Sequence, residues 1–346
     1  MEYNYPKFTP EMKQTHTILI PNMAITQFRL LEYALRYDGY KCEILGNCGS
    51  AVAQLGLKYV HNDTCYPALL VIGQFLDALN SGKYDLDHTA LLITQTGGGC
   101  RASNYIKLLR KALVKAGYGN IPVASLNFSG LEKGSGLPLT VPLLRKVIAS
   151  IFYGDMLVAL RSQTHAYENH RGDADAMTEK WISTIQGWIR DDKNYSAHDM
   201  KRRFYDIAAD YATIPITRVP KVKVGVVGEI YVKYSPLGNN DLEKFLESQD
   251  CEVNLPGLMG FVEYCVANYK LDIDLYGGNK LVAGGADAFL RWLDGIGCAS
   301  YDAMRKYGFY APGSFRELMK KPEGIISLGA KMGEGWLLTA EMIELV

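Results

Sequence analysis

The sequence lacks any uninterrupted apolar run of about 18 residues, the length that a membrane-spanning helix needs. Residues 1–7 also lack the apolar core of a secretory signal peptide. The sequence also has no excess of positive or negative charge, because 37 Lys and Arg residues balance 37 Asp and Glu residues, and no basic run occurs. We therefore expect a cytoplasmic protein with neither a membrane nor a nucleic-acid partner.

The motifs of several enzyme classes are missing too. None of the six histidines belongs to an H-E-x-x-H motif or has a second ligand at zinc spacing, which disfavours catalytic zinc. The absence of a G-x-S-x-G elbow and of a P-loop lysine argues against a serine hydrolase and an ATPase. Gly225-x-x-Gly228-Glu229 departs from the dinucleotide motif G-x-G-x-x-G, so we interpret it as a turn after a strand.

A disulfide framework is also unexpected, because the seven cysteines are odd in number and scattered along a long chain without a signal peptide. Cys42, Cys251 and Cys265 lie on strand-like or helical patterns, where a cysteine usually serves as a small apolar residue. Cys48 and Cys298 are expected in loops. These two remain reserve metal ligands.

The remaining two cysteines each stand just before a predicted helix. Cys65 follows the polar turn 61–64 and precedes Pro67, and a proline in the first turn favours the start of a helix. Cys100 precedes a helical pattern that begins at residue 104. Because helix starts offer unpaired N–H groups and a partial positive charge, they stabilise a thiolate. Cys65 and Cys100 are therefore our candidate metal ligands.

Three glycines, Gly97, Gly98 and Gly99, separate an apolar strand from Cys100. Glycine tolerates positive φ, so backbone amides can crowd around a bound group there. N–H groups aimed at sulfur are one of the levers that set the potential of an iron–sulfur cluster. The pattern favours such a cluster, with the three glycines as cofactor-binding residues.

Short apolar segments alternate with helical patterns from residue 17 to about residue 126. We expect strands at 17–20, 42–45, 90–94 and 122–126, helices at 27–37, 67–79 and 104–116, and a turn segment at 51–60. Strands this apolar predict an α/β fold, in which helices cover both faces of a parallel sheet. The ligands of such sheets bind at the carboxyl edge, where the cysteine loops are expected.

A chain of 346 residues exceeds what one core usually organises, so we expect two domains. Residues 1–137 form the first α/β domain with the cysteine loops, and residues 138–220 form a helical connector. Residues 221–346 form a second α/β domain that is incomplete at its C-terminus. Within it we expect helices at 241–248, 260–269 and 286–293 and a late strand at 325–328.

Four blocks of the sequence, at residues 56–67, 95–105, 224–233 and 333–338, are similar to a known family. They resemble the iron–sulfur components of 2-hydroxyacyl-CoA dehydratases, and in particular the related domain of large acyl-CoA dehydratase activase-related proteins. The Asn-Asp-Thr-Cys-Tyr-Pro and Thr-Gly-Gly-Gly-Cys-Arg motifs of the first two blocks are specific. The Gly-Glu-Ile and Gly-Glu-Gly-Trp motifs of the other two are moderately so.

This resemblance implies two flavodoxin-like (Rossmann-like) domains and a [4Fe-4S] cluster held by three cysteines, with Cys65 and Cys100 as two of them. It also implies a dehydratase (lyase) or reductase component. An ATP-dependent activator protein, or a fused activator domain, would supply one low-potential electron. The electron would convert a 2-hydroxyacyl-CoA thioester to a ketyl radical, which then loses its 3-proton and hydroxide. A second dehydratase-like subunit is a further implied partner.

The third cysteine ligand is where the sequence departs from the family. Relatives of this type carry it in a Phe-x-Cys-Leu-Pro-like block beyond the Gly-Glu-Gly-Trp helix, and this sequence stops at Val346 without that block. The sequence is a fragment, Cys48 or Cys298 substitutes, or no cluster is held. We favour the fragment, because the final helical pattern ends without a stop signal.

Two other functions stay open at this point. The chain could be a non-catalytic module that carries a cluster and relays electrons, or acts as a scaffold, inside a larger activase-related protein. It could also be a flavodoxin-like binding domain without metal. Iron and sulfide analysis under anaerobic conditions separates the last of these from the others.

Overall fold

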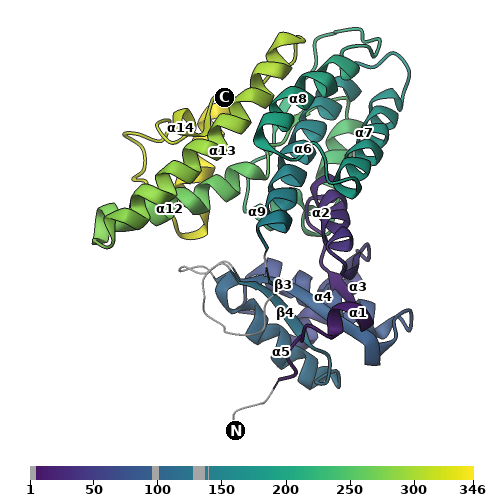
Figure 1. Cartoon of the computed structure of the whole chain (residues 1–346). Helices are drawn as coiled ribbons and strands as arrows, with labels where there is room; N and C mark the ends of the chain where they lie inside the picture. The colour runs from purple at the N-terminus through teal and green to yellow at the C-terminus, as the bar shows by residue number, and fades with distance from the viewer. Residues whose placement is uncertain (1–4, 96–100, 128–136, 139) are drawn as a thin grey trace. The chain divides into compact units, whose positions relative to one another are not determined.

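The computed structural model describes residues 5–95, 101–127, 137–138 and 140–346. The chain divides into two compact units (Figure 1). Unit 1 comprises Met1–Leu144 and Tyr234–Asn240, and unit 2 comprises Arg145–Lys233 and Asp241–Val346. Within the described part of the chain, no helix is both long and apolar enough to cross a membrane.

Unit 1 contains the parallel sheet that the sequence predicts. Its four strands are β1 (Thr17–Ile20), β2 (Lys41–Ile44), β3 (Thr89–Gln95) and β4 (Val123–Asn127). They lie in the order β2-β1-β3-β4, and every neighbouring pair is parallel. The central strands β1 and β3 are buried because most of their residues are apolar on both faces; Leu19 and Leu91, for example, have no exposed surface. The edge strand β2 is only partly buried and begins with the exposed Lys41. The mixed α/β class is therefore confirmed.

The helices of unit 1 connect these strands. They are α1 (Met12–Thr15), α2 (Ile25–Tyr37), α3 (Ser50–Tyr59), α4 (Tyr66–Asn80), α5 (Tyr105–Ala116) and the short α10 (Pro236–Asn239), with 3₁₀ turns η1 (Leu86–His88) and η2 (Arg101–Asn104). The expected turn segment 51–60 is wrong, because this segment is the helix α3. The apolar pattern there was too short to distinguish a helix from a turn.

Two glycines hold α3 and α4 together. A Cβ atom at Gly56 of α3 would collide with the carbonyl oxygen of Leu69 on α4. A Cβ atom at Gly73 of α4 would collide with the carbonyl oxygen of Val52 on α3. The two backbones therefore approach so closely that only glycine fits at these two positions, and the turn between the helices, which leads to Cys65, is positioned by this contact.

Unit 2 is mainly helical. Its helices are α6 (Val141–His165, which begins in unit 1), α7 (Asp173–Arg190), α8 (Ala197–Tyr211), α9 (Ile230–Tyr234), α11 (Leu242–Ser248), α12 (Met259–Tyr276), α13 (Lys280–Lys306), α14 (Phe315–Leu318) and α15 (Gly335–Leu345), and η3 (Met332–Glu334) is a 3₁₀ turn. The helices expected in the connector correspond to α6, α7 and α8. Among the described residues of unit 2, the named strands are β5 (Lys223–Gly225) and β6 (Glu252–Asn254), a short parallel pair.

One expectation for this part of the chain is wrong, and another is right in kind but too short. The late strand expected at 325–328 is a series of turns and bends instead. The helix expected at 286–293 is confirmed, but it is part of the longer α13, which has 27 residues. Gly277 ends α12 with a φ of 83°, and the Asn279 side chain accepts the N–H of Leu281 to begin α13. The two helices form a hairpin (Figure 1).

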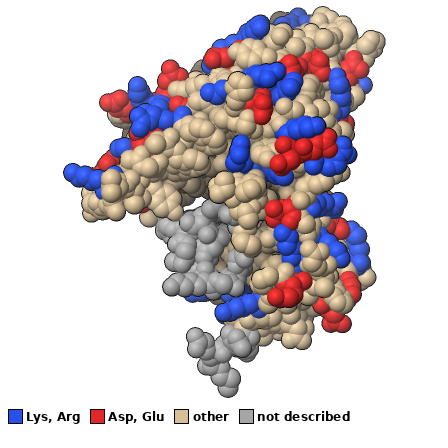
Figure 2. Space-filling view, viewed as in Figure 1, with Lys and Arg blue, Asp and Glu red and all other residues tan. Residues whose placement is uncertain are grey.

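The core of this hairpin region gathers around Trp336, which lies in the first turn of α15 and is fully buried. Its ring lies 5.1 Å from that of Tyr264 on α12 and 6.0 Å from that of Phe315 on α14, measured between centroids. On the surface, Figure 2 shows lysine and arginine interspersed with aspartate and glutamate over the face in view. This mixture agrees with the balanced charge of the sequence.

Candidate functional site

The site expected from the sequence lies around the start of α4. Cys65 is the N-cap residue of this helix, with an extended backbone (φ −59°, ψ 149°), and Pro67 occupies the first turn. The carbonyl oxygen of Cys65 accepts the N–H of Ala68 at 3.1 Å, which begins the helical hydrogen bonds. Its side chain is half-buried and carries a free thiol. The expected position at a helix mouth is confirmed for Cys65.

The thiol of Cys65 meets the start of a second helix. Its Sγ atom lies 2.7 Å from the Oη atom of Tyr105, the first residue of α5, and either atom can donate the hydrogen bond. The first turns of α4 and α5 therefore lie together in unit 1, although 40 residues separate the two side chains in the sequence. Sequence reasoning missed Tyr105, because its helical pattern alone assigns it no partner.

Cys100 and the glycines Gly97, Gly98 and Gly99 lie outside the described residues. The expected approach of the Cys65 and Cys100 sulfur atoms therefore stays a prediction. Tyr105 follows Cys100 by five positions, so the segment with the second cysteine leads directly into the helix that Cys65 contacts. Among the described residues, this connection is the observation that bears on the expected pair of Cys65 and Cys100.

The other cysteines are described in full. Cys42 is buried on β2, and burial raises the pKa of its thiol to about 12. Burial likewise raises the pKa of the Cys265 thiol on α12 to about 12. Both thiols stay protonated at neutral pH, which fits the expected packing role. Cys251 is half-buried just before β6, and Cys48 is exposed in the loop between β2 and α3.

Cys298 is not in a loop as expected, because it lies inside α13. The two glycines before it suggested a break, yet they sit within a continuous helix. Its Sγ atom lies 4.0 Å from the Oδ1 atom of Asp294, one turn earlier. Burial raises the pKa of the Cys298 thiol, and the carboxylate of Asp294 raises it further. Since a metal ligand must be a thiolate, this environment disfavours Cys298 as a substitute ligand.

The described residues contain part of the ligand set expected for a metal cluster. In residues 5–95, 101–127 and 137 onward, apart from residue 139, no three His, Cys, Asp or Glu side chains are grouped so that they could hold a metal ion. Cys65 offers one half-buried thiol at the N-cap of a helix, which suits a cluster ligand. The described residues thus include one of the two cysteines that we expect to bind the cluster, Cys65.

A second group of polar side chains, in unit 2, connects the sequence blocks at residues 224–233 and 333–338. Glu334 has a left-handed backbone (φ 65°), and its carboxylate accepts the N–H of Ile230 at 3.1 Å. The carboxylate of Glu229 accepts the N–H groups of Tyr231 and Val232 at 3.0 and 3.1 Å. Two carboxylates from distant parts of the chain therefore meet at the first turn of α9.

The carboxyl of Glu334 titrates near neutrality. Burial and, to a smaller extent, the charge of Glu229 raise its pKa from the ordinary value to about 7, while Lys233 acts in the opposite direction. A left-handed glutamate is an uncommon conformation that costs conformational energy, so packing must hold it in place. The sequence contains a hint of this turn, because Glu334 is flanked by Gly333 and Gly335.

A buried ion pair lies in the same region. The Nζ atom of Lys233 on α9 is 2.9 and 3.0 Å from the two carboxylate oxygens of Glu341 on α15, and both side chains are only 4% exposed. Burial raises the pKa of Glu341, and Lys233 opposes that rise. Nothing in the sequence pattern separates these two residues from ordinary surface charges.

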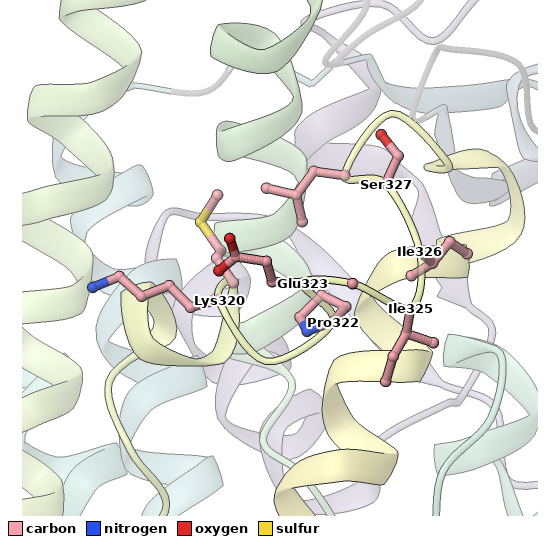
Figure 3. Close-up of a pocket in the computed structure, with 9 residues that line it drawn as sticks. Lys320, Pro322, Glu323, Ile325, Ile326 and Ser327 are labelled. Carbon is pink, nitrogen blue, oxygen red and sulfur yellow. The ribbon is translucent and has the colours of Figure 1, made fainter.

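The hollow in Figure 3 has a volume of about 500 Å³ and is formed by one continuous segment of unit 2, residues 319–328. Lys320 and Glu323 are charged, and the other residues that line it are apolar or small. The Lys320 amine and the Ser327 hydroxyl point in different directions (Figure 3). The hollow therefore does not gather polar groups around one point, and it contains none of the residues expected from the sequence.

Comparisons with known proteins identify no relative of this chain. No protein-family model, no curated protein and no solved structure matches this chain.

Proposed function

We propose that this chain is an iron–sulfur protein in which Cys65 and Cys100 hold a [4Fe-4S] cluster. The observation that carries the proposal is the contact of the Cys65 thiol with Tyr105, 2.7 Å away at the start of α5. It supports a common site for the two cysteine loops, because α5 is the helix into which the Cys100 segment leads. The three glycines before Cys100 would give its loop room for the cluster.

The residues of the chain have separate roles in this proposal. The Cys65 thiolate binds iron from its position at the N-cap of α4, where the start of the helix favours a negative charge. The Tyr105 hydroxyl donates a hydrogen bond to that sulfur, and such bonds tune the potential of a cluster. When bound, the cluster supplies one-electron transfer at low potential.

The resemblance of the four sequence blocks extends the proposal to a reaction. The chain would act as a component of an electron-activated 2-hydroxyacyl-CoA dehydratase or reductase in the cytoplasm. It would receive its electron from an ATP-dependent activator, act on an acyl-CoA substrate and pair with a second dehydratase-like subunit. The strand order of unit 1 supports a flavodoxin-like domain, because β2-β1-β3-β4 is the beginning of the flavodoxin-like order.

Anaerobic preparation of the protein tests the cluster directly. We expect brown protein that contains iron and acid-labile sulfide, and we expect Cys65→Ala and Cys100→Ala each to lose most of both. Cys42→Ala and Cys251→Ala are matched controls that should keep the cluster. Equal iron content in all four variants, or protein without iron after reconstitution, would contradict the proposal.

A further inference from the structure

Two polar contacts fasten α9 to α15 inside unit 2. The carboxylate of Glu334, the N-cap residue of α15, accepts the N–H of Ile230, the first residue of α9, with its two oxygens 3.1 and 3.4 Å from the nitrogen. Three residues further along α9, the Lys233 amine is paired with the Glu341 carboxylate of α15. We call these two contacts the α9–α15 clasp.

The clasp contains more negative than positive charge. Three charged groups act on Glu334, and of these Glu229 and Glu341 are carboxylates and Lys233 is the cation. Lys233 is already engaged by both oxygens of Glu341, at 2.9 and 3.0 Å. Glu334 is 8% exposed and forms no ion pair with any residue in the described part of the chain. A buried carboxylate without a cation is costly, because the interior does not replace its hydration.

The other groups that face Glu334 do not supply the missing positive charge. Glu229 is occupied with the N–H groups of Tyr231 and Val232, at 3.0 and 3.1 Å, and so keeps its carboxylate at the start of α9. Cys265 of α12 has a buried thiol whose pKa is raised first by burial and then by the charge of Glu334. A proton on Glu334 removes negative charge from this group without moving any of its members.

We propose that the α9–α15 clasp is a pH-dependent latch, which is closed while Glu334 is protonated and loosens when Glu334 is ionised. The neutral acid still offers a carbonyl oxygen to the N–H of Ile230, so the contact persists in the protonated form. The ionised form places a buried negative charge beside Glu229 and Glu341. The chain passes from unit 2 to the segment Tyr234–Asn240 of unit 1 directly after Lys233, so the latch fixes the last residues before this passage.

The direction of the pH effect follows from the sign of the shift. The pKa of Glu334 is raised from 4.5 to about 7, first by burial and then by the charge of Glu229. Because the folded pKa lies above the unfolded one, the stabilising contribution of the neutral acid is complete below the ordinary glutamate pKa. It decreases as the pH rises toward the folded pKa and is absent above it. Within this interval the equilibrium constant for opening the clasp increases by up to about tenfold per pH unit.

Amide hydrogen exchange of the full chain tests the proposal. We expect the protection of α9 and of the first turns of α15, corrected for the intrinsic pH dependence of exchange, to fall at least tenfold between pH 5 and pH 7.5. Glu334→Gln keeps an acceptor oxygen for Ile230 and cannot ionise, so it should remove this fall. Glu323→Gln, a matched change at an exposed glutamate of the same unit, should leave the fall as in the wild type.

A second variant tests the cluster of charges and not only the contact. Glu229→Gln keeps an acceptor oxygen but removes the neighbouring charge, so the midpoint of the fall should move to lower pH. Loss of a purely structural contact would not move this midpoint. In protein labelled with ¹³C at the glutamate side-chain carboxyls, the Glu334 signal, identified by its absence from Glu334→Gln, should titrate near pH 7 in the wild type.

Each outcome decides the proposal. A pH response in Glu334→Gln equal to that of the wild type would overturn it. Should that variant not fold, the wild type and Glu229→Gln suffice, because protection of α9 and α15 that is constant from pH 5 to pH 7.5, or a midpoint that stays in place in Glu229→Gln, excludes the latch. A fall in protection at these two helices that Glu334→Gln abolishes supports it.

Discussion

At the scale of single residues, the chemistry of this chain depends on where a few polar groups are buried. Cys65 is half-buried with its thiol against a hydroxyl, whereas Cys42 and Cys265 lie where burial raises the pKa of their thiols to about 12 and keeps them protonated. The same amino acid is thus a candidate ligand in one place and a packing residue in another. Burial and neighbours, and not residue type, make the difference.

The buried pair of Lys233 and Glu341 gives a prediction at this scale. Lys233→Met leaves the Glu341 carboxylate without its partner, so we expect a loss of about 3–5 kcal/mol in the free energy of unfolding at pH 8. The loss should be smaller at pH 5.5, because Glu341, whose pKa burial already raises, can then take a proton. Urea unfolding at the two pH values measures both effects.

Two further variants complete that experiment. The double change Lys233→Met with Glu341→Leu removes both charges and should recover most of the lost stability. Lys270→Met breaks an exposed pair with Asp274 and should cost at most about 1 kcal/mol. A Lys233→Met protein as stable as the wild type at pH 8 would show that the ion pair does not contribute to the free energy of unfolding.

At the scale of elements, the contact between α3 and α4 positions the candidate site. The two glycines let the helix backbones touch, and the chain between the helices contains Cys65. A substitution in this helix contact should therefore displace the start of α4 without changing Cys65, the candidate cluster ligand, itself.

Gly56→Ala tests this role of the helix contact. Its Cβ would collide with the backbone of α4, so we expect a destabilisation of about 1–3 kcal/mol and a lower cluster content after reconstitution. Gly284→Ala, in the interior of α13 where a Cβ meets open space, should instead gain up to about 1 kcal/mol and keep the cluster. Thermal unfolding and iron analysis of the two variants make the comparison. Equal effects of the two changes would mean that the close approach of α3 and α4 is not required.

At the scale of the whole molecule, the charges cancel. The formal net charge is zero at pH 7, and positive and negative side chains are mixed on the surface face shown in Figure 2. Proteins without net charge associate most readily, because nothing repels one copy from another.

We therefore expect self-association, measured as the hydrodynamic radius by light scattering, to be greatest near pH 7 and to decrease at pH 8.5. Lys201→Glu, at an exposed position of α8, changes the net charge by two and should move the maximum to lower pH. Association that does not vary with pH, or that is unchanged in this variant, would argue for a specific contact instead.

The sequence alone predicts much of unit 1. Alternating apolar segments and helical patterns predict its parallel sheet, and the proline and turn before Cys65 predict the start of α4, because these signals are local in the chain. Local signals are also where the errors arise. The glycines before Cys298 suggested a loop, but they lie in the interior of α13, where packing against neighbouring helices overrides the weak preference of glycine against a helix.

Only the tertiary structure decides which side chains meet. Glu334 reaches the N–H of Ile230 across 104 positions of the chain, and Cys65 reaches Tyr105 across 40. No periodicity specifies such contacts, because they result from how whole helices pack.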